Sequence, residues 1–368
     1  MEINKKKLVL FMPSMEGGGV EKNLIIVSNF LSKHIKNILL ISFDKKFKNK
    51  FSKNIKFICP NKKKGNYTKY QKYFYCILLL IKLIIKERKI TIFAFQANIY
   101  CIIVAKIFSK KIIVRSNSSP NGWSKNIFKN LVFKFFFKYS DFIIVNSKNF
   151  KKEIDKLFNV KSVCIYNPLN KNEIIKKSKI KLNKLPYAKG DGLKIINVAR
   201  FTDQKNHLLL LNSLNDIKFK IKFKLLLIGY GQNEKIIKNF IKSSRLEKRI
   251  TIHNFKNNPY NYMRAADLFI LTSDFEGLPN VLLEAMCLKK IIISTDCPTG
   301  PREILQNGKL GTLIKVNDRK ILSKKILEIA KNKSKYQSIA KKAFKNLDDF
   351  SYRENLNKYL IIVKRAIK

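Results

Sequence analysis

Two patterns of apolar residues alternate along the chain. Short apolar runs rich in Ile, Leu, Val and Phe are typical of strands that are buried on both faces of a sheet. They are separated by longer stretches in which apolar residues recur at helical spacing, as in helices that pack on one side. The short runs predict strands at residues 7–12, 37–43, 55–58, 91–95, 111–115, 142–146, 162–166, 194–199, 224–228, 250–253, 268–272 and 291–294.

The longer stretches predict helices between these strands. They lie at residues 20–31, 67–89, 99–108, 125–139, 148–158, 208–214, 233–244, 258–266, 321–331 and 352–367. Strands that are separated by helices indicate parallel βαβ units, because a parallel connection needs a crossover. The pattern therefore predicts an α/β protein with helices on both faces of its sheets.

One segment interrupts this alternation and divides the chain into two domains. Residues 169–192 combine mixed charges with Pro186, Gly190 and Gly192 and show little periodicity, which is typical of a linker. We therefore expect a first domain at residues 1–168 and a second at 193–351, a division that suits a chain of 368 residues. Two doubly wound domains would place the carboxyl ends of both sheets at a shared cleft.

Composition and charge narrow the class of protein. Apolar residues make up 46% of the chain, which excludes global disorder, and the formal net charge is +51. The positive charge is spread over both halves. It reflects either a compositional bias toward Lys, Asn and Ile or adhesion to an anionic surface, lipid or nucleic acid. No zinc-finger, RRM-type or helix-turn-helix signature supports the nucleic-acid alternative.

Cysteine usage and the N-terminus favour a cytoplasmic protein. The six cysteines form no CxxC pair and lie mostly in apolar runs, so we expect reduced, buried thiols. The first apolar run is short and ends at Pro13, which indicates a strand and not a signal peptide. The most apolar segment, residues 73–85, contains Lys82 and is too short to span a bilayer.

The stretch SDFEGLPNVLLEAM carries two carboxylates around a helix start. Glu276 precedes the predicted helix, Pro279 suits its first turn, and Glu284 follows about two turns after Glu276. Free backbone N–H groups at a helix N-terminus attract phosphate, and carboxylates accept hydrogen bonds from hydroxyls. This chemistry suits a sugar or a ribose.

Glycine loops and two cations follow other predicted strands. Gly17-Gly18-Gly19 lets the backbone approach a phosphate, although such loops are often only turns. Gly229 and Gly231 form a second loop of this kind, with a plain βα turn as the alternative. Arg200 and Lys205 follow the first strand of the second domain, where they either clamp a diphosphate or are simply solvated.

The remaining polar motifs are less specific. Residues 115–120, RSNSSP, offer hydroxyls and an amide, but a Ser-rich turn explains them better than a catalytic role does. The histidines, His34, His207 and His253, are expected to be structural. The chain has no DxD pair and no HExxH motif. We therefore expect chemistry without a metal or a cofactor.

Taken in order, these motifs resemble a known family. Their order is similar to that of the family 4 retaining glycosyltransferases, which have the GT-B fold. The motifs are Gly17-Gly18-Gly19, Arg200 with Lys205, the Gly229 loop, and Glu276 with Glu284. The run STDCPTGPREIL further resembles a bacterial subgroup. Its members add N-acetylgalactosamine, galactose or related sugars to lipid-linked oligosaccharides, O-antigen or capsule precursors.

The resemblance implies roles for these residues. Glu284 would hold the ribose, Glu276 the donor sugar, and Arg200 and Lys205 the diphosphate as negative charge develops on it. Further donor-binding positions would be Gly18, Gly19, Gly229, Gly231, Gly277, Leu278, Asn280 and Val281. The C-terminal helix, residues 352–368, would pack back on the first domain. Retention would follow from front-face attack, with no protein nucleophile and no metal.

One departure from the family concerns the loop at Arg115-Ser119. Many relatives carry a His there, whereas this chain has none, so we carry over no catalytic His. Two basic helices, residues 67–89 and 125–139, interleave Lys with aromatic residues. They suggest a membrane-interface surface, with core helices that have a solvated basic face as the alternative.

The sequence therefore predicts a peripheral glycosyltransferase on the inner face of the cytoplasmic membrane. It would use a UDP-sugar and a lipid-linked saccharide or polysaccharide acceptor, and it would not bind nucleic acid. The alternatives are a basic nucleic-acid- or membrane-binding protein without catalysis, a GT-B enzyme that uses a GDP-sugar, and an inactive scaffold.

Overall fold

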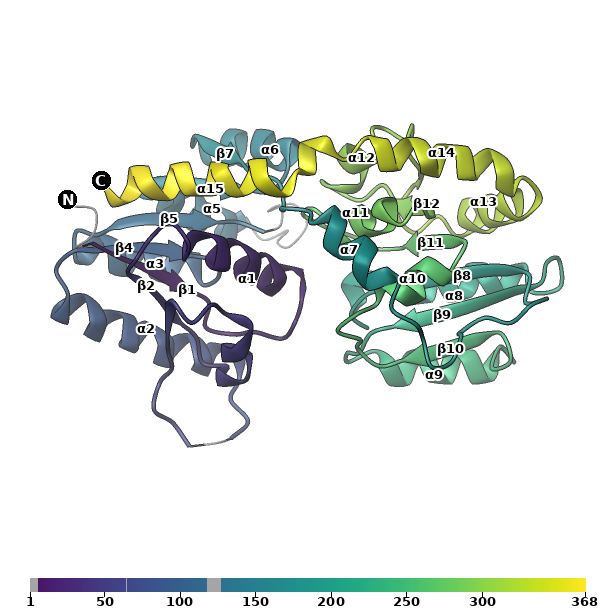
Figure 1. Ribbon diagram of the computed structural model, residues 1–368, viewed down its shortest axis with the longest axis horizontal. Coiled ribbons are helices and arrows are strands. Elements are labelled where there is room, and N and C mark those ends of the chain that lie inside the picture. Colours follow the sequence, from purple (N-terminus) through teal and green to yellow (C-terminus); the bar gives the residue numbers. More distant parts are fainter. Residues whose placement is uncertain (1–5, 64, 118–126) are drawn as a thin grey trace. The chain divides into compact units, whose positions relative to one another are not determined.

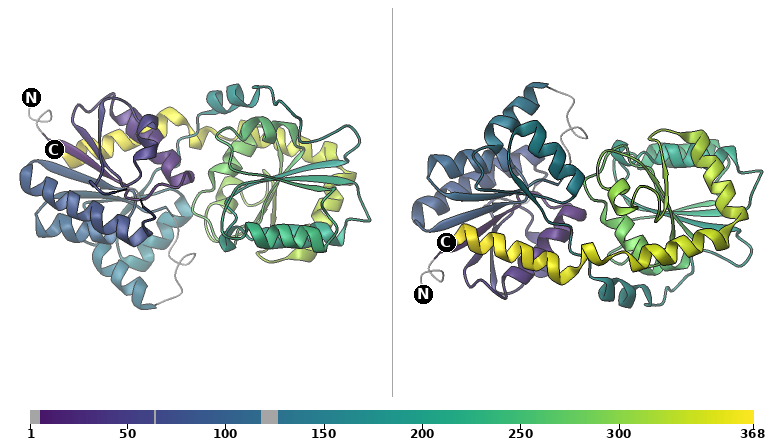
Figure 2. Two further views of the ribbon diagram at one scale, coloured as in Figure 1. Left: turned by 90° about the horizontal axis from the view of Figure 1, so that it is seen from below. Right: turned by 90° about the horizontal axis from the view of Figure 1, so that it is seen from above.

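The computed structural model describes residues 6–63, 65–117 and 127–368, and the side chains of residues 127–129 are not described. It separates into two compact units (Figure 1). Unit 1 comprises Met1–Pro168 together with Tyr352–Lys368, and unit 2 comprises Leu169–Ser351. Each unit is built around one parallel sheet with helices on both faces (Figure 2).

The described part of unit 1 contains a seven-stranded sheet in the order β3-β2-β1-β4-β5-β6-β7. Its strands are β1 (Lys7–Phe11), β2 (Ile38–Ile41), β3 (Ile55–Ile58), β4 (Ile90–Ala94), β5 (Lys111–Arg115), β6 (Phe142–Val145) and β7 (Ser162–Cys164). Most of these strands are apolar runs, because both faces of the sheet are covered. Along β1, Leu8 and Leu10 pack into one core, whereas Val9 and Phe11 pack into the core on the opposite face.

Helices cover both faces of this sheet. They are α1 (Gly19–Leu31), α2 (Lys69–Lys86), α3 (Asn98–Ile107), α5 (Ile127–Phe137), α6 (Lys148–Phe158) and α15 (Tyr352–Ile367). The helices α1 and α15 share one core with Leu8, while α2, α3, α5 and α6 share the other core with Val9.

The described part of unit 2 contains a six-stranded parallel sheet in the order β10-β9-β8-β11-β12-β13. Its strands are β8 (Leu193–Val198), β9 (Phe223–Ile228), β10 (Ile250–His253), β11 (Leu268–Leu271), β12 (Ile291–Thr295) and β13 (Thr312–Ile314). The strand order reverses between β8 and β11. In open α/β sheets, ligands bind at such a switch point, beyond the carboxyl ends of the strands.

Helices of unit 2 also lie on both faces of the sheet. They are α7 (Lys171–Ser178), α8 (His207–Asp216), α9 (Glu234–Ser243), α10 (Tyr260–Ala265), α11 (Asn280–Cys287), α12 (Pro301–Ile304), α13 (Arg319–Lys331) and α14 (Lys333–Lys345). The core on one face is formed with α8, α9 and α13. The helices α7, α10 and α11 contact one another, while α14 contacts α11 and also contributes Tyr336 to that core.

Part of the expected linker, residues 169–192, is folded structure, so that assignment is corrected. Helix α7 occupies its first part and packs against α10 and α11 of unit 2. The side chain of Asn170 caps this helix by accepting a hydrogen bond from the backbone N–H of Glu173 at 3.1 Å. The helix was not predicted because its only buried residues are Ile174 and Ser178, too few for a periodic pattern.

The helix α15 is fixed to unit 1 by a buried polar group as well as by apolar packing. Arg115, at the end of β5, is fully buried. Its Nε donates to the hydroxyl of Tyr359 on α15 at 2.9 Å, and its Nη2 donates to Asn167 Oδ1 at 2.7 Å. A buried guanidinium is costly unless it is hydrogen-bonded, so these acceptors are integral to the core.

We predict that Tyr359→Phe destabilises unit 1 by about 1–3 kcal/mol, because it leaves a buried donor of Arg115 without its acceptor. Urea denaturation measures the change in the free energy of unfolding. Tyr70→Phe is the matched control, since that ring lies at the surface and its hydroxyl is solvated. Equal stability of the two variants would contradict a structural role for this hydrogen bond.

Candidate active site

Two sequence-predicted residues meet at the switch point of unit 2. Lys205 follows β8 and Glu276 follows β11, and these two strands are neighbours in the sheet. The Lys205 ammonium forms an ion pair with Glu276 Oε1. Both side chains are largely withdrawn from solvent, so the attraction is screened less than at an open surface. Residues that are far apart in the sequence thus form one charged centre.

Hydrogen bonds from neighbouring loops hold Glu276 in place. Ser273 Oγ donates to Glu276 Oε1 at 2.7 Å, and Thr299 Oγ1 donates to the Glu276 backbone carbonyl at 2.7 Å. The loop after β8 is fastened to the same segment, because Gln204 Nε2 donates to the Phe275 carbonyl at 2.8 Å. The backbone and one carboxylate oxygen of Glu276 are therefore fixed by three separate segments.

The second carboxylate oxygen of Glu276 is not engaged in the same way. Both Lys205 and Ser273 donate to Oε1, and no described residue donates to Oε2. Because Lys205 neutralises the carboxylate and Ser273 orients it, Oε2 is held ready to accept a hydrogen bond from a hydroxyl. This is the chemistry expected of a sugar-binding group.

The glycines after β9 allow their loop to pack against the Arg200 segment. A Cβ on Gly229 would lie 1.9 Å from the Ala199 carbonyl oxygen, and one on Gly231 would lie 2.3 Å from that of Phe201. The backbone N–H of Phe201 donates to the Tyr230 carbonyl at 2.8 Å. Arg200 lies at the centre of this contact, and its side chain is exposed. The glycines thus have a packing role whether or not they touch a ligand.

Glu284 lies on α11 and is also buried. Its Oε1 accepts a hydrogen bond from the Tyr260 hydroxyl of α10 at 3.3 Å. This contact orients the carboxylate from a helix that precedes it by 24 positions. Tyr260 is a site residue that the sequence analysis missed, because nothing near it in the chain indicates its partner.

The start of α11 is tightly packed. Pro279 precedes the helix as its N-cap, one position earlier than a first-turn residue. Gly277 is buried and lies against Gly300. A Cβ on Gly300 would lie 2.3 Å from the Gly277 carbonyl oxygen, and Gly300 has a φ of +81°. Asn280 and Val281 form the first turn and are partly exposed, while Leu278 is buried. The backbone positions named from the sequence therefore form one continuous turn.

An acidic residue lies close to the glycine loop of unit 1, in the first turn of α1. Gly18 is the N-cap of α1, and Gly19 begins the helix. Glu21 in the first turn is buried and accepts a hydrogen bond from the Glu16 backbone N–H at 3.1 Å. A Cβ on Gly18 would lie 3.0 Å from Glu21 Oε2. This carboxylate already occupies the positive end of the helix, where an anion would otherwise be attracted.

The polar loop after β5 differs from the sequence-based expectation at its first residue. The guanidinium of Arg115 points into the core of unit 1, as described above, and does not belong to a ligand site. Asn117 Nδ2 donates to the Phe95 carbonyl at 3.1 Å. Residues 118–120 of this motif lie outside the described residues, so the expected hydroxyl groups there are not placed.

His207, the first residue of α8, supports the Lys205 loop that precedes it. It is buried, and its Nε2 lies 3.1 Å from Asn197 Oδ1 on β8. Burial, together with the neighbouring charge of Lys205, lowers the pKa of His207 from its ordinary value of 6.5 to about 4. The ring is therefore neutral at physiological pH, as the structural role predicted for it requires.

No metal centre is evident in residues 6–63, 65–117 and 127–368. Nowhere in these ranges do three His, Cys, Asp or Glu side chains lie within reach of one ion.

In the same ranges, no helix has the length and apolar character needed to cross a membrane.

Comparison with known proteins identifies relatives of this arrangement. Residues 179–346 match the sequence model of the family described as "Glycosyl transferases group 1". A Campylobacter jejuni protein is 27% identical over 372 aligned positions, covering 97% of this chain and all of its own length. It is the N-acetylgalactosamine-N,N'-diacetylbacillosaminyl-diphospho-undecaprenol 4-alpha-N-acetylgalactosaminyltransferase.

Solved structures show the same fold over nearly the whole chain. HepE from Anabaena, in complex with UDP and glucose, has a TM-score of 0.80 at 17% identity and covers 98% of this chain and 100% of its own. The sucrose-phosphate synthase of Thermosynechococcus elongatus has a TM-score of 0.82 at 14% identity and covers 98% of each chain. With its two parallel-sheet units, the chain has the GT-B fold.

The burial of His207 predicts a pH dependence of stability. The unfolded chain protonates this residue near pH 6.5, but the folded chain does so only near pH 4. Between these values the unfolded state binds more protons, so stability falls as the pH falls, by about 1.4 kcal/mol per pH unit. Urea denaturation of wild type and His207→Gln at pH 6.5 and 5 should show a smaller loss in the variant.

His34→Gln is the matched control, because His34 is exposed. It should leave the pH dependence of the wild type unchanged. A His207→Gln variant that loses as much stability as the wild type over this pH interval would contradict the buried neutral state of His207.

Proposed function

Because the chain is a glycosyltransferase of group 1 type with the GT-B fold, we propose that it transfers a hexose or N-acetylhexosamine from a UDP-sugar. The acceptor in this proposal is a lipid-linked saccharide or a cell-surface polysaccharide, and the configuration of the sugar is retained. The observation that carries the proposal is the buried Lys205–Glu276 pair at the switch point, beside the Arg200 loop.

Lys205 and Arg200 have complementary roles in this proposal. Charge develops on the departing diphosphate during transfer, and fixed cations aimed at that charge lower the barrier. Arg200 is exposed beyond β8 and supplies a forked donor, while Lys205 is held nearby by Glu276 and supplies a point charge. These cations serve in place of a metal ion, and no cofactor is needed.

The two buried carboxylates divide the recognition of the donor. Glu276 presents Oε2 to a hydroxyl of the sugar, since its other oxygen is engaged by Lys205 and Ser273. Glu284, oriented by Tyr260, accepts hydrogen bonds from the ribose hydroxyls. Backbone groups of Gly277, and of Leu278, Asn280 and Val281 at the start of α11, face the phosphate side. In this proposal Gly229 and Gly231 allow their loop to lie close to the nucleotide.

Two relatives support the choice of donor and acceptor. HepE binds UDP and glucose, and the name of the Campylobacter relative gives a diphospho-undecaprenol saccharide as its acceptor. A GDP-sugar is the alternative donor. A donor-hydrolysis screen over a panel of UDP- and GDP-sugars distinguishes them, with turnover expected only for a UDP-sugar. Turnover of a GDP-sugar alone would overturn the UDP assignment.

Substitutions at Arg200 and Glu284 should separate turnover from binding. We expect Arg200→Ala to lower kcat by about 10²–10³-fold, because a donor to the developing charge is lost. We expect Glu284→Ala to weaken donor binding by about 2 kcal/mol, because hydrogen bonds to a charged group are lost. Steady-state kinetics and equilibrium binding of UDP measure these effects.

Arg353→Ala and Glu247→Ala are the matched controls, since both side chains are exposed and lie outside the proposed site. They should retain the kinetics of the wild type. Unchanged kinetics in Arg200→Ala or in Glu284→Ala would remove that residue from the proposed site.

We also propose that unit 1 binds the inner face of the cytoplasmic membrane through one helical surface. The helices α2, α3 and α5 are neighbours that cover the same face of the sheet. Their exposed large apolar residues are Tyr70, Phe74, Leu78, Ile85, Tyr100, Ile107, Leu131 and Phe135. Exposed lysines accompany them at Lys69, Lys82, Lys86, Lys106 and Lys134. We call this surface the α2–α3–α5 face.

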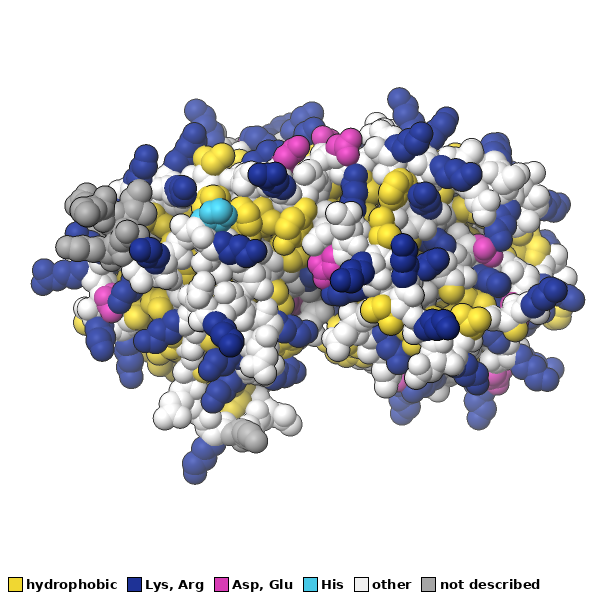
Figure 3. Space-filling model, viewed as in Figure 1, with side chains coloured by type: hydrophobic (Ala, Val, Ile, Leu, Met, Phe, Trp, Pro, Cys, Tyr) yellow, Lys and Arg dark blue, Asp and Glu magenta, His cyan; other side chains and the backbone are white. Residues whose placement is uncertain are grey.

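Apolar and cationic side chains on one surface suit a membrane interface. The rings enter the headgroup region while each lysine near anionic lipid contributes on the order of 1 kcal/mol. Positive charge alone does not single out this face, because Lys and Arg are spread over both units (Figure 3). The exposed aromatic residues distinguish it.

Co-sedimentation with phosphatidylglycerol vesicles tests this surface. Binding of the wild type should weaken at high salt, because exposed charges are screened. The double substitution Phe74→Ser and Phe135→Ser should reduce binding severalfold at low salt. Phe219→Ser is the control, since Phe219 is an aromatic residue of unit 2 that is even more exposed than Phe74 and Phe135. No binding of the wild type at low salt would overturn the membrane proposal.

A further inference from the structure

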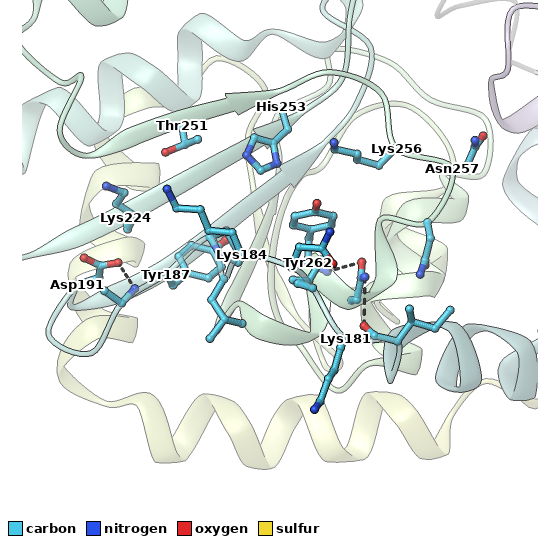
Figure 4. A pocket seen from close by; sticks show the side chains of 18 residues that line it. Lys181, Lys184, Tyr187, Asp191, Lys224, Thr251, His253, Lys256, Asn257 and Tyr262 are labelled. Carbon is cyan, nitrogen blue, oxygen red and sulfur yellow. Dashed lines mark hydrogen bonds between the residues drawn. The ribbon is translucent and has the colours of Figure 1, made fainter.

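A cavity lies within unit 2, formed by residues that the proposed transfer reaction does not use. It has a volume of about 900 Å³ and lies between the β9–β10 edge of the sheet and residues 180–188 (Figure 4). Lys224 on β9 and Thr251 and His253 on β10 form its floor. Arg200, Lys205, Glu276 and Glu284 do not line it.

The cavity is strongly cationic. Its lining includes Lys181, Lys184, Lys224 and Lys256 but only one acidic residue, Asp191. The carboxylate of Asp191 accepts a hydrogen bond from the Ala188 backbone N–H at 2.6 Å and forms no ion pair with a described residue. The positive charge of the cavity is therefore not neutralised by its own walls.

Two of the lysines flank His253 in the view of Figure 4. Figure 4 shows the side chains of Lys184 and Lys256 on either side of the His253 ring, whereas Lys181 extends away from it. Neither Lys184 nor Lys256 forms an ion pair with a described residue, while the Lys224 ammonium donates to the Lys248 carbonyl at 2.7 Å. Lys184 and Lys256 are thus the cations available to a ligand.

His253 lines the cavity with its imidazole ring. Its Nδ1 accepts or donates no hydrogen bond to a described residue, and its ring packs edge-on against Tyr262, with 5.4 Å between the ring centroids. Burial, followed by the charge of Lys256, lowers the pKa of His253. A protonated imidazole donates hydrogen bonds to phosphate oxygens, so His253 adds a donor to the lysines that line the cavity.

We propose that this cavity binds a phosphate-bearing ligand through Lys184, Lys256 and His253. A phosphate monoester or diphosphate carries more than one negative charge and several acceptor oxygens, which matches several cations around one donor ring better than a single carboxylate does. Such a ligand supplies an acceptor for a protonated His253. The volume leaves space for more than an isolated phosphate group.

The ligand is either a soluble phosphorylated compound or the headgroup of an anionic lipid. Ile180 and Leu185, which line the cavity, are exposed apolar residues that would suit the non-polar part of either. The helix α10 lies between this cavity and the donor-site carboxylate, because Tyr260 contacts Glu284 and Tyr262 contacts His253. The two sites therefore share a wall but no lining side chain.

Histidine NMR of the full-length protein tests the proposal. The chain has three histidines, so ¹³C labelling of the ring carbons gives few signals, and His253→Gln assigns the one required. Inorganic pyrophosphate should shift the His253 signal and raise the pKa of its ring. In the double variant Lys184→Gln/Lys256→Gln, the apparent affinity should fall at least tenfold.

Two controls separate this site from general charge and from the donor site. Lys341→Gln/Lys342→Gln removes the same charge from the exposed surface of α14 and should behave as the wild type. Arg200→Ala should leave the His253 response intact. The proposal is overturned by an unshifted His253 signal in the wild type, by equal weakening in both lysine pairs, or by loss of the response in Arg200→Ala.

Competition with lipid vesicles identifies the source of the phosphate group. Phosphatidylglycerol vesicles that prevent the pyrophosphate shift in the wild type, while phosphatidylcholine vesicles do not, support a lipid headgroup. If neither vesicle changes the shift, the site takes a soluble phosphorylated ligand.

Discussion

The ion pair between Lys205 and Glu276 joins the loops that follow two neighbouring strands, β8 and β11. Each loop alone would expose a mobile charge. Together, with Ser273 and His207 as neighbours, they form a centre in which Oε1 of Glu276 accepts two hydrogen bonds and Oε2 accepts none from a described residue. The packing of Gly229 and Gly231 against Ala199 and Phe201 fixes the backbone on both sides of Arg200, in the same loop as Lys205. The parallel sheet of unit 2 provides the rigid frame.

The architecture could be predicted from the sequence because its strands are buried on both faces. A strand such as β1 is then a continuous apolar run, and most of these runs could be recognised one at a time. The exceptions are elements with little buried surface. The helix α14 is rich in lysine, β13 spans only Thr312–Ile314, and neither carries a pattern strong enough to be recognised locally.

The sequence could predict only those parts of the site whose residues lie close together along the chain. Glu276 and Glu284 occur in one short motif, so they could be named together. Lys205 was predicted as a diphosphate-binding cation but not as the partner of Glu276, and Tyr260 was missed. These partners meet the carboxylates only after the sheet has brought separate loops together. Arg115 shows the same limitation, since its chain position suggested a ligand-facing loop whereas its acceptor is 244 residues away. Contacts over such distances are set by topology and leave no trace in local spacing.

The connection between Arg115 and Tyr359 has a consequence for how the chain is made. The strands of unit 1 emerge from the ribosome first, but α15 is synthesised only after all of unit 2. Until then the Arg115 guanidinium lacks its Nε acceptor, and the face of the sheet that α15 covers is open. Because domains generally fold as units during synthesis, the inserted unit 2 can complete its fold before unit 1 does. The nascent first unit is therefore the part of the chain with most need of a chaperone.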